Sequence, residues 1–275
     1  MRHTAPSTPL EGVSRLVEAG GLRLHFLEHG SAGAPPLLIL PGITSPAATW
    51  EFVALELAHE RHVITMDLRG RGLSDTGPVY HLEALAGDVA VALPALGIER
   101  CAILGHSAGA RVAVAVGVLH PGIRGPVIAA DPPVSGPGRA AYPTPAGAFV
   151  ESIRLAQAGA TADDMRPFFP TWTEEQLALR AAWLPTCDDA AVAEVHRLFH
   201  EEDFFDWWPR LEPQALFLWG GESPAVDASS AAEAAEANPA AEVVELPNAG
   251  HMLPWDDLDG FLAAVRAFLD RAEAP

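Results

Sequence analysis

Ser107, which has a glycine two positions before it and another two positions after it, is the residue in this chain with the clearest potential for nucleophilic catalysis. The run Cys101–Gly109 is a short apolar strand that ends in Gly-His-Ser-Ala-Gly, and a helix of small residues follows. This is the strand, turn and helix context in which a G-x-S-x-G motif is meaningful. The sharp turn strains the backbone of Ser107, so its neighbours Gly105 and Gly109 must be tiny. We therefore predict that Ser107 is a nucleophile; the alternative is a glycine-rich turn that buries a structural serine.

A serine hydroxyl needs a base to take its proton, and His251 is the predicted base. It lies in the loop Asn248–Trp255, which follows the last apolar run of the chain at 242–246. A short loop at that place overhangs the carboxyl ends of the strands, beside Ser107. The competing histidine, His106, lies inside the turn and is expected to point away from the serine.

The base in turn needs an acid that holds its tautomer, and Asp131 is the predicted acid. It ends the apolar run at 126–130, the strand directly after the serine's own strand. Adjacent parallel strands lie about 4.8 Å apart, so Asp131 can reach the far side of the same histidine. Glu222 and Asp227, which follow a later strand at 215–219, are the alternatives, and a turn or N-cap aspartate is the structural reading of Asp131.

Two main-chain N–H groups are needed to stabilise the oxyanion of an acyl-transfer reaction. One is predicted at Ala108, the residue after the nucleophile, at the positive end of its helix. The second is predicted at Ile43, in the loop that follows the apolar run at 37–40.

These residues together resemble the α/β-hydrolase superfamily across nearly the whole chain. The resemblance rests on the order Ser107, Asp131, His251, with the run Asp67–Gly72 (DLRGRG) ahead of them. Two positions depart from the family's pattern. Ser223 stands where the family usually has its acid, and Pro41 replaces the histidine of the usual His-Gly before the oxyanion loop.

Three loop segments resemble more narrowly the N-formylmaleamate deformylases, the amide hydrolases of bacterial nicotinate degradation. The segments are Leu40–Pro46, Asp131–Arg139 and Gly221–Val226. The resemblance implies an acid after the strand that follows the nucleophile, which supports Asp131.

The same resemblance implies a reaction. Ser107 would attack the formyl carbonyl of N-formylmaleamate and release maleamate, and His251 would then activate water to release formate. Because the substrate is a small anion and the chain has no lysine, the pocket requires an arginine if the carboxylate is paired. Arg139, just beyond Asp131, is the predicted substrate-binding residue; a solvated loop arginine is the alternative.

The elements that must position these residues alternate between apolar strands and helices, which predicts a doubly wound, mostly parallel sheet. Strands are expected over 16–17, 22–27, 36–40, 62–66, 101–104, 126–130, 215–219 and 242–246. Helices are expected over 50–59, 81–96, 110–119, 231–237 and 258–271. The alternation stops between 132 and 210, where helices are expected over 146–158, 174–183 and 190–200. We predict an α/β-hydrolase core of residues 1–131 and 211–275 with a helical cap of residues 132–210.

Composition excludes several other classes of function. A net charge of −19 argues against nucleic acid or an anionic membrane as a partner. All 17 basic residues are arginine, which excludes a Walker A loop and a Schiff-base lysine. Two cysteines, Cys101 and Cys187, and the lack of an apolar leader or a membrane-length run favour a cytoplasmic protein. We expect a small-molecule substrate, no cofactor, and either a monomer or a homo-oligomer.

Three other functions fit parts of the same pattern. A general carboxylesterase or amidase would use the same triad. A cofactor-free dioxygenase of this fold would use only the His–Asp pair, to deprotonate an N-heteroaromatic ring. A capped ligand-binding receptor is disfavoured, because the triad is complete.

One further pair of residues has the spacing of metal ligands. His196 and His200 lie one helical turn apart, and the acidic run 201–203 follows them. A zinc peptidase helix needs a glutamate directly after its first histidine, and Arg197 stands there. A polar helix face is the favoured interpretation, and no metal is expected.

Overall fold

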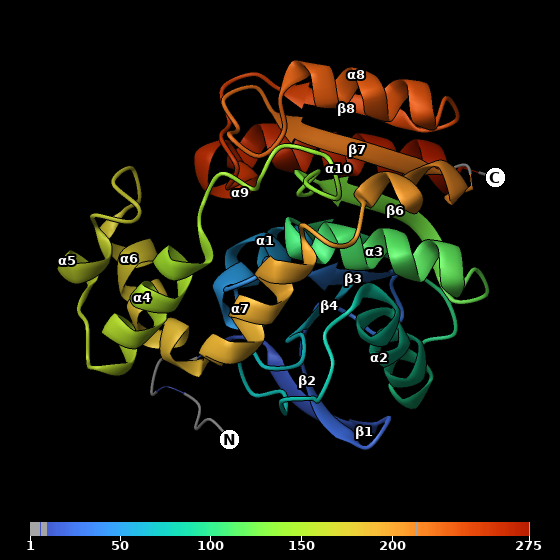
Figure 1. Cartoon of the computed structure of the whole chain (residues 1–275). Coiled ribbons are helices and arrows are strands. Elements are labelled where there is room, and N and C mark those ends of the chain that lie inside the picture. Colours follow the sequence, from blue (N-terminus) through green and yellow to red (C-terminus); the bar gives the residue numbers. More distant parts are fainter. Residues whose placement is uncertain (1–5, 7–9, 213, 275) are drawn as a thin grey trace.

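The computed structural model describes residues 6, 10–212 and 214–274, and its centre is an eight-stranded sheet (Figure 1). The strand order is β1-β2-β4-β3-β5-β6-β7-β8. The strands are β1 (Val13–Ala19), β2 (Leu22–His29), β3 (Pro36–Leu40), β4 (His62–Met66), β5 (Cys101–His106), β6 (Arg124–Ala130), β7 (Ala215–Gly220) and β8 (Glu242–Leu246). β2 is antiparallel to β1 and to β4, and all other neighbours are parallel. The predicted, mostly parallel sheet is confirmed.

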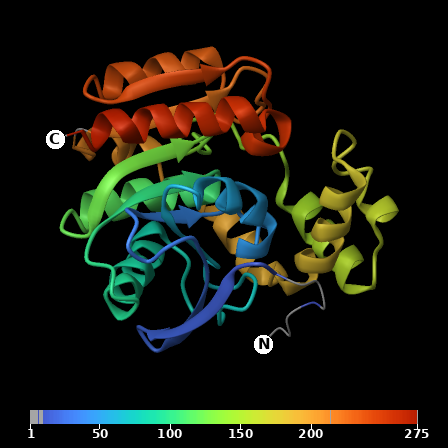
Figure 2. The same ribbon diagram turned by 180° about the vertical axis from the view of Figure 1, so that it is seen from behind.

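Helices cover both faces of the sheet, as Figures 1 and 2 show from opposite sides. One face carries α2 (Leu82–Ala95), α3 (Ala108–Leu119) and α8 (Ala228–Ala237), and the other carries α1 (Glu51–Leu57) and α10 (Leu258–Ala272). The central strands β5, β6 and β7 are buried along their whole length. Their near-continuous apolar sequences are therefore those of strands covered on both faces.

The segment between β6 and β7 contains no strand among its described residues. It holds α4 (Ala146–Gln157), α5 (Ala162–Met165), α6 (Glu174–Trp183) and α7 (Asp189–Leu198). α4, α5 and α6 lie together at one side of the sheet in Figure 1. The sequence predicted three of these helices but not α5, whose four residues are too few for a periodic pattern. The division into core and cap at residues 131 and 210 stays a prediction.

Strand register decides where the chemistry-bearing residues meet. His106 of β5 pairs with Ala130 of β6, and Ala130 pairs with Leu218 of β7. The residues that follow β5 and β6 therefore leave the sheet at the same edge. Ser107 and Asp131 are these residues. No helix in the described part of the chain is long and apolar enough to cross a membrane.

Candidate active site

Ser107 occupies a strained turn between β5 and α3, as the motif predicted. Its backbone has φ 54° and ψ −122°, a conformation that residues with a Cβ rarely adopt. A Cβ added to Gly105 would collide with the carbonyl of Gly109, and one added to Gly109 would collide with the carbonyl of Leu40. Both glycines are thus required: Gly105 because α3 begins directly against it, and Gly109 because it lies against the end of β3.

His251 and Asp131 complete a chain of hydrogen bonds that begins at Ser107. The Nε2 atom of His251 lies 3.0 Å from the Ser107 hydroxyl, and its Nδ1 lies 2.7 Å from Asp131 Oδ2. A carboxylate can only accept here, so Nδ1–H donates to Asp131 and Nε2 is left to accept from the serine. The arrangement has the geometry of a nucleophile, a base and an orienting acid.

The carboxylate of Asp131 is fully buried and is satisfied by more than the histidine. The N–H of Gly220 donates to Oδ1 over 3.0 Å, and the Ser223 hydroxyl donates to Oδ2 over 2.6 Å. Asp131 itself has a positive φ of 47°, which is uncommon for a residue other than glycine. Strained backbone at both Ser107 and Asp131 is typical of a functional site held in place by its surroundings.

Neither alternative acid, Glu222 or Asp227, forms a hydrogen bond or ion pair with His251 in the described structure; the ring's acid partner is Asp131. Asp227 caps the first turn of α8 by accepting from the N–H of Ser230 over 2.8 Å. Glu222 extends from the loop after β7 without a hydrogen bond from the histidine ring. Ser223, where the family usually has its acid, instead donates a hydrogen bond to Asp131.

His106 supports the His251 loop. Its Nε2–H donates to the main-chain oxygen of His251 over 2.7 Å. Burial lowers the pKa of His106 to about 3, so the ring is neutral. A neutral ring that holds the backbone of His251 fits the expectation that His106 is not the base.

The two predicted oxyanion donors flank the serine. Ala108 is the first residue of α3, so its N–H has no acceptor within the helix. The loop that contains Ile43 passes close to the nucleophile, since a Cβ on Gly42 would lie 3.4 Å from the Ser107 Cβ. Arg71, from the DLRGRG run, donates from Nε to the carbonyl of Ile43 over 2.9 Å and fixes that loop. Donation by Ile43 and Ala108 to a substrate stays a prediction.

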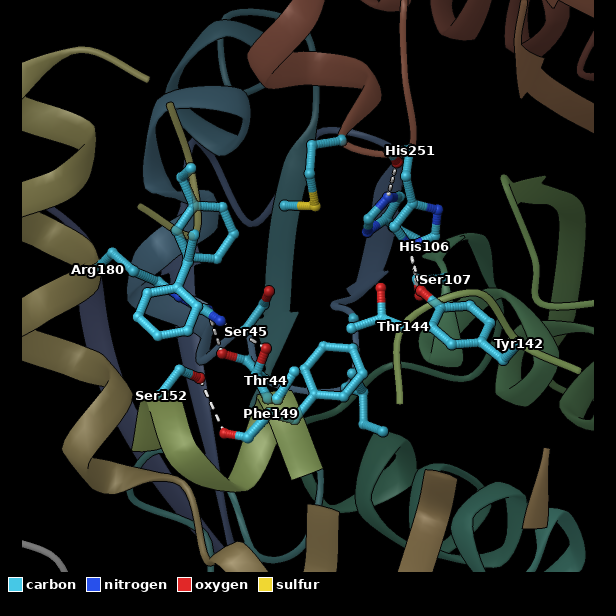
Figure 3. Close-up of a pocket in the computed structure, with 16 residues that line it drawn as sticks. Thr44, Ser45, His106, Ser107, Tyr142, Thr144, Phe149, Ser152, Arg180 and His251 are labelled. Carbon is cyan, nitrogen blue, oxygen red and sulfur yellow. Dashed lines mark hydrogen bonds between the residues drawn. The ribbon is translucent and has the colours of Figure 1, made fainter. Parts of the chain in front are cut away.

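A cavity of about 170 Å³ opens beside Ser107 and His251 (Figure 3). Its walls combine hydroxyl groups and apolar rings with one guanidinium. The hydroxyl groups belong to Thr44, Ser45, Tyr142, Thr144 and Ser152, the rings to Phe149, Phe168 and Phe169, and the guanidinium to Arg180. No aspartate or glutamate of the described chain lines it.

Comparison with known proteins decides the family. The family described as the alpha/beta hydrolase fold matches residues 35–258, which span most of the chain and include Ser107, Asp131 and His251. The chain belongs to the α/β-hydrolase family. It is an enzyme of the hydrolase class.

Two relatives that are similar over nearly full length are deformylases. An N-formylmaleamate deformylase of Pseudomonas putida is 46% identical over 257 residues, which cover 92% of this chain and 95% of the relative. A crystal structure of a serine-to-alanine variant of the N-formylmaleamic acid deformylase Nfo from Pseudomonas putida S16 has 41% identity and a TM-score of 0.86. That comparison covers 92% of this chain and 100% of the other.

A more distant relative is also named for an amide. The 2-(acetamidomethylene)succinate hydrolase of Mesorhizobium japonicum is 27% identical over 275 residues, 94% of this chain and 95% of the relative.

In this hydrolase, Arg139 does not lie in the catalytic cavity, contrary to the sequence-based expectation. Its guanidinium donates to Asp203 over 2.8 Å and to Glu233 over 2.7 and 2.9 Å. It also stacks over the ring of Phe205 at 4.3 Å. With two carboxylates as partners, Arg139 joins the segment after β6 to α8 and does not line the cavity beside Ser107.

Two residues that line the hydrolase's cavity, Tyr142 and Arg180, are not predicted by any sequence motif. The Tyr142 hydroxyl lies 3.1 Å from His251 Nε2, and burial raises the pKa of this phenol well above its usual range. Arg180 projects from α6 toward Thr44. No local motif surrounds either residue, and only the folded segment between β6 and β7 brings them to the site.

The helix face that carries His196 and His200 is not wholly polar, because His196 is buried. His196 donates from Nε2 to the carbonyl of Thr144 over 2.8 Å, and its ring packs against Tyr142 and Phe199. No group of three metal-type side chains gathers in the part of the chain that the structure describes.

Proposed function

We propose that this hydrolase is a serine amidohydrolase that removes the formyl group of N-formylmaleamate, giving maleamate and formate. The observation that carries the proposal is the hydrogen-bonded series of Ser107, His251 and Asp131, of which Ser107 and His251 line a small cavity. The 46% identity to an N-formylmaleamate deformylase over 92% of the chain supports the choice of substrate.

The first half of the reaction forms a formyl-enzyme. Ser107 Oγ attacks the formyl carbon while His251 Nε2 takes the hydroxyl proton, and Asp131 stabilises the imidazolium that results. The N–H groups of Ile43 and Ala108 bind the oxyanion of the tetrahedral intermediate. His251 then gives its proton to the leaving nitrogen, the C–N bond breaks, and maleamate departs.

The second half returns the enzyme to its starting state. A water molecule attacks the formyl ester while His251 takes one of its protons. The second tetrahedral intermediate collapses, the proton returns to Ser107 Oγ, and formate leaves. The net reaction is the hydrolysis of one C–N bond by one water molecule, with no change of oxidation state, so the two half-reactions balance without a redox cofactor.

The two thiols suit a reducing compartment. Cys101 and Cys187 are both buried and unpaired, and burial raises the pKa of the Cys101 thiol to about 12. We place the activity in the cytoplasm, where such thiols remain reduced.

Formate release tests the proposal. Purified enzyme is expected to form formate and maleamate in equal amounts from N-formylmaleamate, with a kcat/KM at least about 10⁴ M⁻¹s⁻¹, the lower end for enzymes on their own substrates. Two other kinds of compound are tested beside it. Simple aryl esters are followed by their hydrolysis, and an N-heteroaromatic compound is followed by oxygen uptake. Preference for the aryl esters would contradict the proposal in favour of a general esterase, and oxygen consumption would favour a dioxygenase.

A further inference from the structure

The catalytic cavity contains a buried cation without a counter-ion. Arg180 is only 5% exposed, and its guanidinium lies over the ring of Phe169 at 5.0 Å, but no aspartate or glutamate of the described chain forms an ion pair with it. Its two hydrogen bonds within the described structure both go to Thr44, one from Nη1 to the main-chain oxygen and one from Nη2 to the hydroxyl over 2.6 Å. Its Nε–H has no partner. A guanidinium has five N–H donors, so most of this one's capacity is unused.

Four of the five other buried arginines among the described residues are compensated. The exception is Arg71, which donates only to the main-chain oxygens of Ile43 and Arg69 and has an unpartnered Nη2, but it does not line the catalytic cavity. Arg61, Arg69 and Arg124 each pair with a carboxylate. Arg111 has no carboxylate, but it donates to four main-chain oxygens, which belong to residues 133, 135, 199 and 202. An uncompensated buried charge is costly, and of these six arginines only Arg180 lines the catalytic cavity, where its unused donors can meet a ligand.

The surroundings of Arg180 complete a site for an anion. Figure 3 shows it across the cavity from Ser107, with Thr44 and Ser45 between them. The Thr44 hydroxyl accepts from Arg180, so its own proton is free to be donated to a ligand. The Ser45 hydroxyl lines the same cavity. Although the chain carries 36 acidic residues, none of the described ones lines this cavity.

We propose that Arg180, with the hydroxyl of Thr44, is the subsite that binds the carboxylate of the substrate and makes the enzyme selective for small acids. The inference deepens the proposed deformylation and rests on it for the identity of the scissile bond. Arg180 thereby takes the role that the sequence assigned to Arg139.

The subsite and the oxyanion loop share one short segment. Thr44 directly follows Ile43, the predicted oxyanion donor, so a carboxylate held at Arg180 is placed at a fixed separation from the carbonyl that Ser107 attacks. Burial lowers the pKa of Arg180 to about 10, so the guanidinium stays charged at neutral pH. Fixed separation between an anion site and a nucleophile selects substrates by the length between their two functional groups.

Steady-state kinetics of Arg180→Met on two matched substrates test the subsite. The substrates are N-formylmaleamate and its neutral carboxamide analogue, both followed by formate release. We expect kcat/KM for the acid to fall about 100-fold, mainly through KM, because a charge-assisted hydrogen-bonded pair is lost. For the carboxamide we expect a change within about threefold. Equal losses on both substrates would overturn the proposal, because Arg180 would then only hold the loop at Thr44.

Two controls separate the subsite from a general loss of structure. Arg180→Lys retains the charge without the planar fork, and we expect it to recover part of the preference for the acid. Arg154→Met removes an arginine from α4 that is exposed and paired with Asp189, and kinetics on both substrates should match the wild type. If Arg180→Met fails to fold, the wild type alone is informative. It should prefer the acid over the carboxamide by about 100-fold, and equal rates would contradict the subsite.

Binding without turnover distinguishes failure of the subsite from failure of the proposed function. Maleate is the probe, titrated by calorimetry into Ser107→Ala and into Ser107→Ala with Arg180→Met. We expect the second variant to bind about 100-fold more weakly. Arg180-dependent binding of maleate by an enzyme that releases no formate would contradict deformylation and retain the subsite. If the wild type releases formate but maleate binds equally well with and without the Arg180→Met substitution, the subsite is overturned and the proposed deformylation stands.

Discussion

Ser107→Ala is expected to lower kcat for N-formylmaleamate by about 10⁵-fold or more, since loss of the nucleophile alone is about as damaging as loss of a whole triad. The reason is that the hydroxyl is the group His251 deprotonates, at a distance of 3.0 Å, and alanine leaves nothing to form the acyl bond. The KM should change little, because the methyl group fills most of the same space. Formate release over hours, with enzyme in large amounts, measures the residual rate.

The Ser107→Ala variant should fold like the wild type, so a loss of activity can be attributed to the missing hydroxyl. Alanine at 107 retains the same backbone demand as serine, so the melting temperature and circular dichroism should stay close to those of the wild type. Labelling by a fluorophosphonate probe should disappear with the hydroxyl. Turnover near the wild-type rate would show that Ser107 is a structural residue of the turn and would remove the nucleophile from the proposal.

Asp131→Asn is expected to lower kcat by about 10⁴-fold, the loss that follows when the histidine of a triad takes the wrong tautomer. The asparagine amide can donate to His251 Nδ1, and Nε2 then carries the proton and cannot accept from Ser107. Asparagine retains the volume of the buried side chain, so the change is one of hydrogen bonding. The kcat values of Asp131→Asn and Asp131→Ala should both be measured, because near-full activity in either contradicts the acid assignment.

A substitution at Ser223 tests whether a carboxylate at a neighbouring position can replace Asp131 as the acid. Its hydroxyl donates to Asp131 Oδ2 over 2.6 Å, so a side chain at 223 already reaches the acid. We expect Ser223→Asp in the Asp131→Asn background to restore part of the lost kcat, because it returns a carboxylate to the neighbourhood of His251. Ser223→Ala in the same background is the matched control and should restore none.

The triad could be predicted from sequence because its members are anchored to strand ends. Ser107 and Asp131 each follow a strand by one residue, and parallel pairing brings these ends together whatever lies between them. His251 follows the last strand by a short loop. Each of these positions depends on an apolar run that can be recognised locally, and on the regular spacing of strands in a sheet.

The substrate side of the site could not be predicted in the same way. Arg139 lies near Asp131 in sequence, which predicts a place in the site, but its partners Asp203 and Glu233 are 64 and 94 residues away. Arg180 lies in a helix whose bounds, Glu174–Trp183, were predicted, yet the residue it contacts, Thr44, is 136 residues distant. Periodicity identifies a helix but not the loop against which it packs.

Trapping the acyl-enzyme tests the central claim, that Ser107 cleaves the formyl amide through a covalent intermediate. Wild-type enzyme is mixed with N-formylmaleamate, quenched in acid within the first turnovers, digested and measured by mass spectrometry. We predict a single formyl group on the peptide that carries Ser107, located on the serine oxygen, and none in Ser107→Ala. Formate in the same quenched samples with an unmodified Ser107, or with the formyl group on another side chain, would contradict the account.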